Sequence, residues 1–131
     1  MGMIKVDQFA ILSSKPVDSP DINIESNYSI DAKNKAIGCL VKIKYRDGEN
    51  LQLILDVVCG FSIKPEDWDE MAEDKYITMP KGFLRHITLH TIGTARGIMH
   101  CKTEATPMNQ YILPPINLEE MITEDVTFPL E

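Results

Sequence analysis

Alternation of apolar and polar positions is strongest between residues 37 and 63, where it predicts two long β-strands. Apolar side chains, including two cysteines, occupy every odd position from Ile37 to Tyr45 and from Leu51 to Ile63. Lysine, arginine, glutamine and aspartate fall among the even positions. A period of two is typical of a strand that buries one face. We therefore expect two half-buried strands in this part of the chain.

The turn between these strands contains Asp47-Gly48, a pair that usually marks a two-residue hairpin. A two-residue turn there would place lysines on the same face as the leucines, so side-chain parity excludes it. A three-residue loop at residues 46–48 keeps every odd residue on one face and places Ile43 opposite Leu51. We predict this loop, with a left-handed Gly48 in a bulge.

Two further strands are expected before this hairpin. Residues 5–14 predict a short first strand, and residues 22–30 carry apolar side chains at most even positions. The change from even to odd phase predicts a bulge or break near residues 31–36. The expected sheet therefore has four antiparallel strands.

A long helix and a short one are expected after the sheet. Pro80 suits a first helical position, and the periodic apolar pattern continues until Thr106-Pro107 stops it, giving about 25 residues. Residues 117–125 predict a two-turn helix with Asn117 as its N-cap. The acidic stretch 64–75 predicts a solvated loop or a short irregular helix.

The long helix has more apolar surface than one sheet can cover. At about 100° per residue, one stripe, assigned to the sheet, gathers Phe83, Leu84, Ile87, Ile98 and Cys101. A second group would be buried if the same helix of a second subunit approached closely. This predicted oligomer interface comprises Leu89, Ile92, Gly93, Gly97 and Met99. The alternative is an irregular helix with isolated apolar side chains on its surface.

Length and composition indicate one α+β domain spanning residues 1–131, with a four-stranded antiparallel sheet, one long helix and a short C-terminal helix. The net charge of -7 argues against nucleic-acid binding. Three cysteines without a CxxC pair predict small buried side chains in a reducing compartment: Cys39, Cys59 and Cys101. We expect no signal peptide and no membrane insertion, and therefore a cytoplasmic protein.

Motifs for catalysis or metal binding are weak. His86 and His90 have the i, i+4 spacing of metal ligands, but the glutamate of an HExxH motif is missing, so we expect packing at a helix interface and no metal site. The sequence has no GxSxG motif, no glycine-rich phosphate loop and no EF-hand spacing. We therefore expect no enzyme activity and no cofactor.

The stretch YILPPINLEEM at residues 111–121 combines large apolar side chains with Pro114 and Pro115. The prolines exclude a helix interior and a central strand. Such a stretch is typical of an ordered loop or a binding surface.

The sequence resembles the SecB family of preprotein chaperones. The resemblance rests on CGFSI at residues 59–63, TARGIMHCKTEATP at 94–107 and ILPPINLEEM at 112–121, and extends loosely over residues 5–123. It implies that the sheets of two protomers join edge to edge, that the long helices pack into a homodimer or homotetramer, and that an apolar groove holds unfolded client polypeptide. The implied client contacts are Phe61, Ile63, Tyr111, Ile112, Leu113, Ile116, Met121 and Ile122, with Phe9, Ile11, Tyr28 and Ile30 as weaker candidates.

The resemblance predicts an ATP-independent holding chaperone, for protein export or for a dedicated client such as an antitoxin. Two departures argue against docking to the motor ATPase SecA: the last helix is short, and the even face of the sheet mixes Lys42 and Lys44 with Asp56. They fit service to a toxin-antitoxin pair at least as well. The alternative is a non-enzymatic scaffolding module that binds one folded partner.

Overall fold

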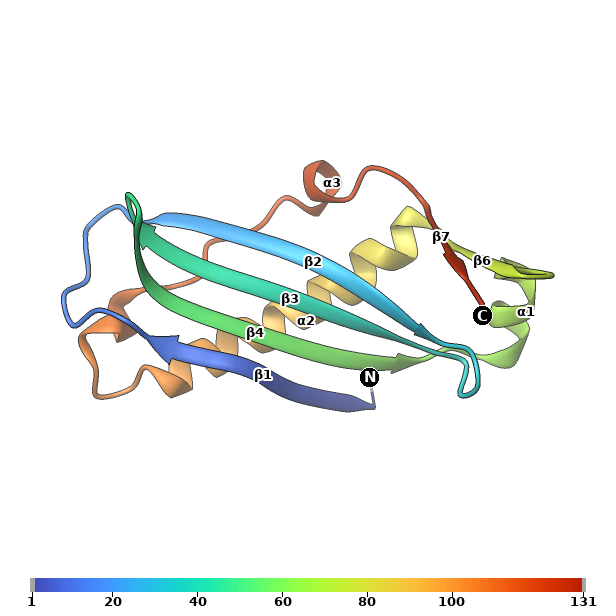
Figure 1. The fold of residues 1–131 in the computed structure, drawn as a ribbon, viewed down its shortest axis with the longest axis horizontal. Helices are drawn as coiled ribbons and strands as arrows, with labels where there is room; N and C mark the ends of the chain where they lie inside the picture. The colour runs from blue at the N-terminus through green and yellow to red at the C-terminus, as the bar shows by residue number, and fades with distance from the viewer. Residues whose placement is uncertain (1, 131) are drawn as a thin grey trace.

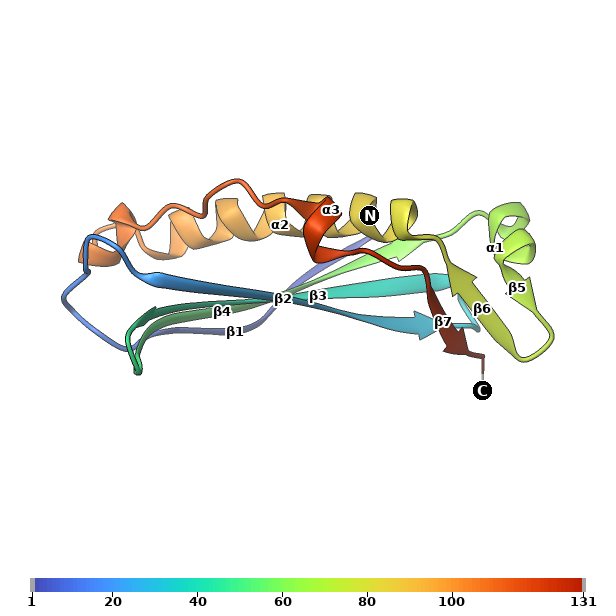
Figure 2. The same cartoon turned by 90° about the horizontal axis from the view of Figure 1, so that it is seen from above.

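A four-stranded antiparallel sheet and a long helix form the two layers of the molecule (Figures 1 and 2). The computed structural model describes residues 2–130. The strand order is β1-β4-β3-β2, so β1 and β2 form the two edges. The strands are β1 (Met3–Ile11), β2 (Asp21–Asp31), β3 (Ala36–Asp47) and β4 (Asn50–Ser62). The predicted fold class, four antiparallel strands followed by a long helix, is confirmed.

The β3-β4 hairpin confirms the parity argument but corrects the loop. Gly48 has a φ of 61°, as predicted, yet the turn has two residues, Gly48 and Glu49, between the paired Asp47 and Asn50. Ile43 lies opposite Leu55, not Leu51. The odd residues of both strands still share one face, because a bulge in β4 supplies the extra residue. Arg46 pairs with Leu51 and Tyr45 with Leu53, which leaves Gln52 unpaired between them.

The break predicted near residues 31–36 is a turn that joins β2 to β3 and contains Lys35 at a φ of 50°. Beyond β4, the acidic stretch forms the short helix α1 (Pro65–Met71), which buries Trp68. A second, small sheet then forms from β5 (Ala72–Glu73), β6 (Tyr76–Met79) and β7 (Val126–Pro129). The C-terminal residues thus contain a strand, β7, that pairs with β6 and that the sequence analysis did not predict.

The long helix α2 (Lys81–Lys102) has 22 residues and lies diagonally across the sheet (Figure 1). Its buried face differs from the predicted stripe, since Cys101 is exposed and Phe83 and Ile98 are only half-buried. The buried residues are Leu84, Ile87, Thr88, Thr91, Ile92, Ala95 and Met99. The two threonines misled the prediction because their hydroxyls donate to carbonyls four residues back, which allows polar side chains to face the sheet.

Two short elements follow α2: a 3₁₀ helix (Pro107–Gln110) and α3 (Leu118–Met121). Asn117 caps α3 as predicted, with its side-chain oxygen accepting from the backbone N–H groups of Glu119 and Glu120. The helix has four residues, so the prediction of two turns is wrong. The core lies between α2 and the odd-numbered side chains of β3 and β4, and it contains the buried Cys39 and Cys59.

Candidate functional site

The segment from Tyr111 to Ile122 runs antiparallel to the chain direction of α2 and then passes over the β2 side of the sheet (Figures 1 and 2). Its first half is extended, because Pro114 and Pro115 cannot join a helix interior or donate to a strand. Its second half is the single-turn helix α3. We call residues 111–122 the C-terminal strap.

Two arginines of α2 hold the strap through its backbone carbonyls. Arg96 donates from Nε to the carbonyl of Leu113 at 3.1 Å and from a terminal nitrogen to that of Pro114 at 3.2 Å. Arg85 donates to the carbonyls of Ile122 at 2.9 Å and Glu119 at 3.3 Å. These contacts hold the strap through its backbone, so they do not depend on the side chains at the four accepting residues.

Tyr111 anchors the start of the strap in the protein core. Its ring stacks on Tyr45, with centroids 4.9 Å apart and planes at 17°. Its hydroxyl donates to the side-chain oxygen of Gln52 and accepts from the N–H of Val17 at 2.7 Å. Gln52 in turn donates to the carbonyl of Lys15 at 3.1 Å. The β4 bulge therefore places Gln52 where it joins the strap to the β1-β2 connection.

The hydroxyl of Tyr45 differs from that of its stacking partner Tyr111 in having no hydrogen bond to the described residues. It is also buried. Burial raises the pKa of Tyr45 to about 12, because the phenolate would be desolvated, and the nearby charge of Arg96 opposes this rise only in part.

An apolar groove lies between the strap and the edge strand β2. Its walls are Ile22 and Ile24 on one side and Pro114, Pro115, Ile116 and Met121 on the other, with Asn117 and Glu120 at its rim. The inward-facing residues of β2 are half-buried, whereas those of β3 are fully buried. The strap therefore covers β2 incompletely and leaves apolar surface accessible.

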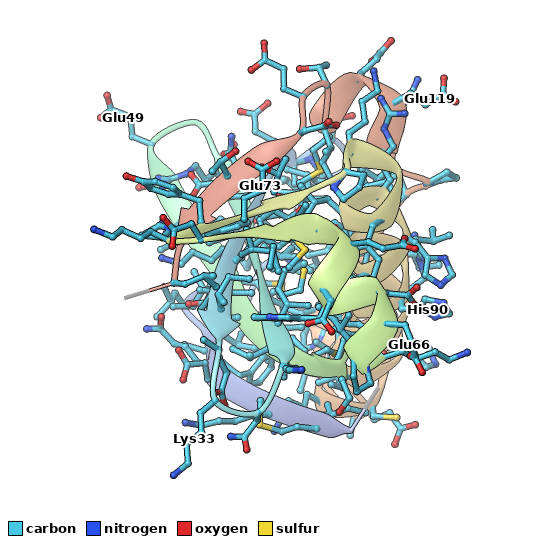
Figure 3. The ribbon with its side chains drawn as sticks, turned by 90° about the vertical axis from the view of Figure 1, so that its right-hand side faces the viewer. Lys33, Glu49, Glu66, Glu73, His90 and Glu119 are labelled. Atoms are coloured by element: carbon cyan, nitrogen blue, oxygen red, sulfur yellow. The ribbon has the colours of Figure 1, made fainter. Side chains whose placement is uncertain are left out.

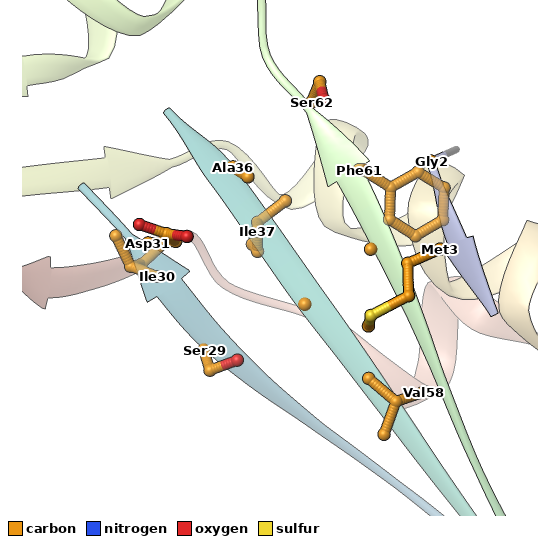
Figure 4. A pocket seen from close by; sticks show the side chains of 12 residues that line it. Gly2, Met3, Ser29, Ile30, Asp31, Ala36, Ile37, Val58, Phe61 and Ser62 are labelled. Carbon is orange, nitrogen blue, oxygen red and sulfur yellow. The ribbon is translucent and has the colours of Figure 1, made fainter. Parts of the chain in front are cut away.

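Two other hollows flank the strap and the sheet. One lies between the strap and the outer side of α2 and is lined by Gly93, Arg96, Gly97, His100 and Ile112, among others. The other lies at one end of the sheet, where Gly38 and Gly60 face each other on adjacent strands. Figure 4 shows this pit, with Met3, Val58 and Phe61 around it.

The predicted client contacts fall into three groups by exposure. Five are buried in the core: Phe61, Ile63, Tyr111, Leu113 and Ile122. Ile116 and Met121 are half-buried and line the groove, and Ile112 is 71% exposed but points to the α2 side of the strap. The weaker candidates Phe9, Ile11, Tyr28 and Ile30 are half-buried against the core. Only Ile116 and Met121 therefore meet at the open groove.

The predicted oligomer-interface residues do not share one face of α2. Ile92 and Met99 are buried against the sheet of their own protomer, at 2% and 1% exposure. Leu89, Gly93 and Gly97 are exposed, and a Cβ added to either glycine would meet no described atom within 4 Å. The outer face of α2 is therefore narrower and less apolar than predicted.

His86 and His90 lie on the exposed side of α2, with ring centroids 4.6 Å apart in a T-shaped arrangement. Figure 3 shows His90 at the periphery of the molecule. No group of three or more potential ligands from histidine, cysteine, aspartate and glutamate converges within residues 2–130. In that same range no helix has the length and apolarity needed to cross a membrane.

Four residues that line the groove or hold the strap were missed by the sequence analysis as site residues. Ile22 and Ile24 were recognised as strand residues, and their alternation indicates the core-facing side of the sheet, but no pattern places them beside the proline stretch. Arg85 and Arg96 had no signal, because hydrogen bonds to backbone carbonyls leave no pattern in the partner sequence. The extra residue at Gln52 was also invisible, since a bulge shows only when the register of two strands is known.

No protein-family model matches the chain, and no curated protein matches it in sequence.

Proposed function

We propose that this protein is an ATP-independent holding chaperone that binds non-native polypeptide in extended form, without a cofactor. The observation that carries the proposal is the open apolar groove between β2 and the strap. It runs beside Ile22 and Ile24, near the start of the edge strand β2, and its other wall is the extended strap, so its shape suits an extended chain better than a compact ligand. The resemblance to SecB-like chaperones described above supports the same function.

The chemistry of the groove fits a binder with little sequence preference. Met121 has a flexible thioether side chain that can repack around different partners, and Ile116 offers a branched apolar surface. Pro114 and Pro115 reduce the entropy that the strap would lose on binding. The arginine contacts hold the strap in place without using its side chains for this purpose. Apolar contacts of this kind are insensitive to salt, so capture of clients should persist at high ionic strength.

Self-association is part of the proposal. Leu89 is 57% exposed on the outer face of α2, and the neighbouring Gly93 and Gly97 leave room for a close approach. A homodimer or homotetramer formed there would keep the groove free on the other side of the strap. Export of clients and service to an antitoxin both remain compatible with this arrangement, and the mixed charges on the outer face of the sheet argue against SecA as a partner.

A second candidate function is an interaction module that binds one folded partner. The pit at Gly38 and Gly60 favours it, because a preformed hollow at one end of the sheet suits one fixed side chain of a partner (Figure 4). Such a module would need neither the groove nor a flexible wall.

Capture of chemically unfolded proteins distinguishes the two functions. Two unrelated unfolded proteins are diluted into the purified protein, and their aggregation is followed by light scattering. The double variant Ile116→Ser, Met121→Ser should lose most of this protection, because it makes the groove wall polar. Val58→Ser, at the pit on the opposite face, is the matched control and should protect like the wild type.

Other outcomes would contradict the chaperone proposal. Equal protection by the wild type and the groove double variant would exclude the groove as the client site. Protection of neither unfolded protein by the wild type would favour the module, particularly if a single folded partner binds and Val58→Ser abolishes that binding. Circular dichroism confirms that each variant is folded.

A further inference from the structure

The hollow between the strap and the outer side of α2 differs in charge from the groove and from the pit. Glu120 lies at the rim of the groove, and Asp31 lines the pit. Among the described residues, no aspartate or glutamate lines this hollow, and its basic side chains are Arg96 and His100. We call it the basic hollow. In a chain with a net charge of -7, such a site indicates a ligand of negative charge.

The inner surface of the basic hollow is apolar. Met99 and Leu113 line it and are 1% and 2% exposed, so they form its floor. Ile112 also lines it and is largely exposed, so it lies at the rim and the hollow opens to solvent there. A concave, mostly apolar site with a few polar groups is typical of small-molecule binding.

Two glycines keep the helix side of the basic hollow clear. Gly93 and Gly97 line it, and a Cβ added to either would meet no described atom within 4 Å. They are about one helical turn apart on the same face of α2. A short acyl chain can therefore lie close to the helix backbone along this stretch.

Arg96 can bind a carboxylate without releasing the strap. Its Nε and one terminal nitrogen donate to the carbonyls of Leu113 and Pro114, and a guanidinium has more N–H donors than these two bonds use. His100 is exposed and lies one turn further along the same face of α2. Both side chains can therefore donate to one carboxylate, and hydrogen bonds to a charged acceptor are stronger than neutral ones.

We propose that the basic hollow binds a small apolar carboxylate of the medium-chain fatty acid class. The carboxylate accepts from Arg96 and His100, and the acyl chain covers Met99 and Leu113. The carboxyl terminus of a polypeptide fits less well, because its last backbone groups would need further partners. The hydroxyl of Tyr111, which also lines the hollow, is already bonded to Gln52 and Val17.

Isothermal titration calorimetry with octanoate tests the class of ligand, and octanamide is the neutral control. Octanoate should bind about tenfold or more tightly than octanamide, because only the carboxylate gains charge-assisted hydrogen bonds. An acetylated tripeptide that ends in leucine with a free carboxylate should bind more weakly than octanoate. Equal affinity for octanoate and octanamide, or tighter binding of the tripeptide, would overturn the proposal.

The position of the site is tested by filling the hollow. Gly97→Leu should remain folded, since nothing crowds its Cβ, and should weaken octanoate binding about tenfold or more. Gly82→Leu is the matched control, because Gly82 lies in the first turn of α2, outside the hollow, and its Cβ would also meet no described atom within 4 Å.

A second variant addresses the polar end of the ligand. His100→Ala should weaken octanoate binding several-fold, and it decides the matter if Gly97→Leu does not fold. Circular dichroism reports the fold of each variant. Wild-type affinity for octanoate in Gly97→Leu and in His100→Ala would place the ligand elsewhere and overturn the proposal.

One consequence rests on the proposed function, because the proposed self-association uses the same two glycines. A ligand beside Gly93 and Gly97 and the helix of a second subunit cannot occupy the same space. Octanoate should therefore lower the mean mass measured by light scattering, and octanamide should not. Binding without a change of mass would support the ligand site and place self-association elsewhere. Absence of octanoate binding, with capture of unfolded proteins intact, would overturn the ligand site alone.

Discussion

The inward-facing side chains of β3 and those of β2 have the same alternation and different surroundings. Ile43 on β3 is fully buried beneath α2, whereas its cross-strand neighbour Ile24 on β2 is half-buried beneath the strap. The two isoleucines lie side by side on one face of one sheet. The difference arises from what covers them: a 22-residue helix in one case and an extended segment with a single helical turn in the other.

The comparison suggests that, on one face of one sheet, the residues under α2 contribute to stability and the residues under the strap are available for binding. We call the side chains of the sheet that α2 covers the closed layer. This layer contributes to folding, and its residues cannot contact a partner unless the protein unfolds. We call the side chains between β2 and the strap the open layer, because the strap covers β2 only in part. Its apolar surface is accessible to water, and a partner can bury it. The strap joins the two layers, since Tyr111 and Leu113 lie in the closed one and Ile116 and Met121 in the open one.

The largest expected effect comes from truncating one isoleucine of each layer. Ile43→Ala should lower the free energy of unfolding by about 2 to 5 kcal/mol, because it leaves a cavity in the closed layer. Ile24→Ala removes the same atoms from a half-buried position and should cost less than about half as much. Urea unfolding of both variants measures the difference. Equal losses of unfolding free energy would mean that Ile24 is packed as closely as Ile43.

A smaller effect is expected at the stacked tyrosines that join the layers. Tyr111→Phe leaves the buried Gln52 oxygen and the Val17 N–H without their partner, so it should lower the free energy of unfolding by about 1 to 3 kcal/mol. Tyr45→Phe removes a hydroxyl that has no partner among the described residues, and should be neutral or stabilising. A larger loss in Tyr45→Phe than in Tyr111→Phe would contradict this assignment.

The pH dependence of the unfolding free energy gives an independent test of the burial of the Tyr45 hydroxyl. Its pKa is raised from 10.0 to about 12 in the folded state, so the unfolded state releases this proton first as the pH rises. The contribution of Tyr45 to stability is therefore complete below about pH 10 and is lost as the pH rises toward about 12. Tyr45→Phe should lose less stability than the wild type in this window, as measured by unfolding at pH 9 and pH 11.

The sequence predicted the strands and the long helix well because their periods are local. Alternation placed the four strands, and parity required both the left-handed Gly48 and an extra residue near the hairpin. It could not place that residue, because a bulge in the loop and a bulge at Gln52 keep the same parity. The predicted buried face of α2 was also wrong. Thr88 and Thr91 donate within the helix and face the sheet, but a periodic pattern counts threonine as polar.

The groove was harder to predict than the fold. The family resemblance assigned six apolar residues of the strap to one binding surface, yet of these Leu113 is 2% exposed and the adjacent Ile112 is 71% exposed. An extended segment alternates its side chains between two directions, and the sequence does not say which direction faces the core. That choice is made by tertiary contacts, chiefly the Tyr111 anchor and the two arginines.

The smallest expected loss of global stability comes from releasing the strap. Arg96→Met keeps most of the aliphatic side chain and removes the hydrogen bonds to the carbonyls of Leu113 and Pro114. Because these bonds are partly or fully exposed to solvent, the free energy of unfolding should fall by only about 0.5 to 1.5 kcal/mol. Local opening should change more than global unfolding, since the strap would lose the contacts of one of the two arginines that hold its backbone.

Hydrogen exchange measured by mass spectrometry separates the local effect from the global one. Backbone amides of residues 111–122 should exchange several-fold faster in Arg96→Met, while those of β3 and β4 change only as global stability does. Arg46→Met is the matched control, because Arg46 lies on the outer face of the sheet, where no described side-chain hydrogen bond involves it. Unchanged exchange in the strap would show that Tyr111 and the buried Leu113 hold it without the arginines. The open layer over β2 would then be a rigid surface.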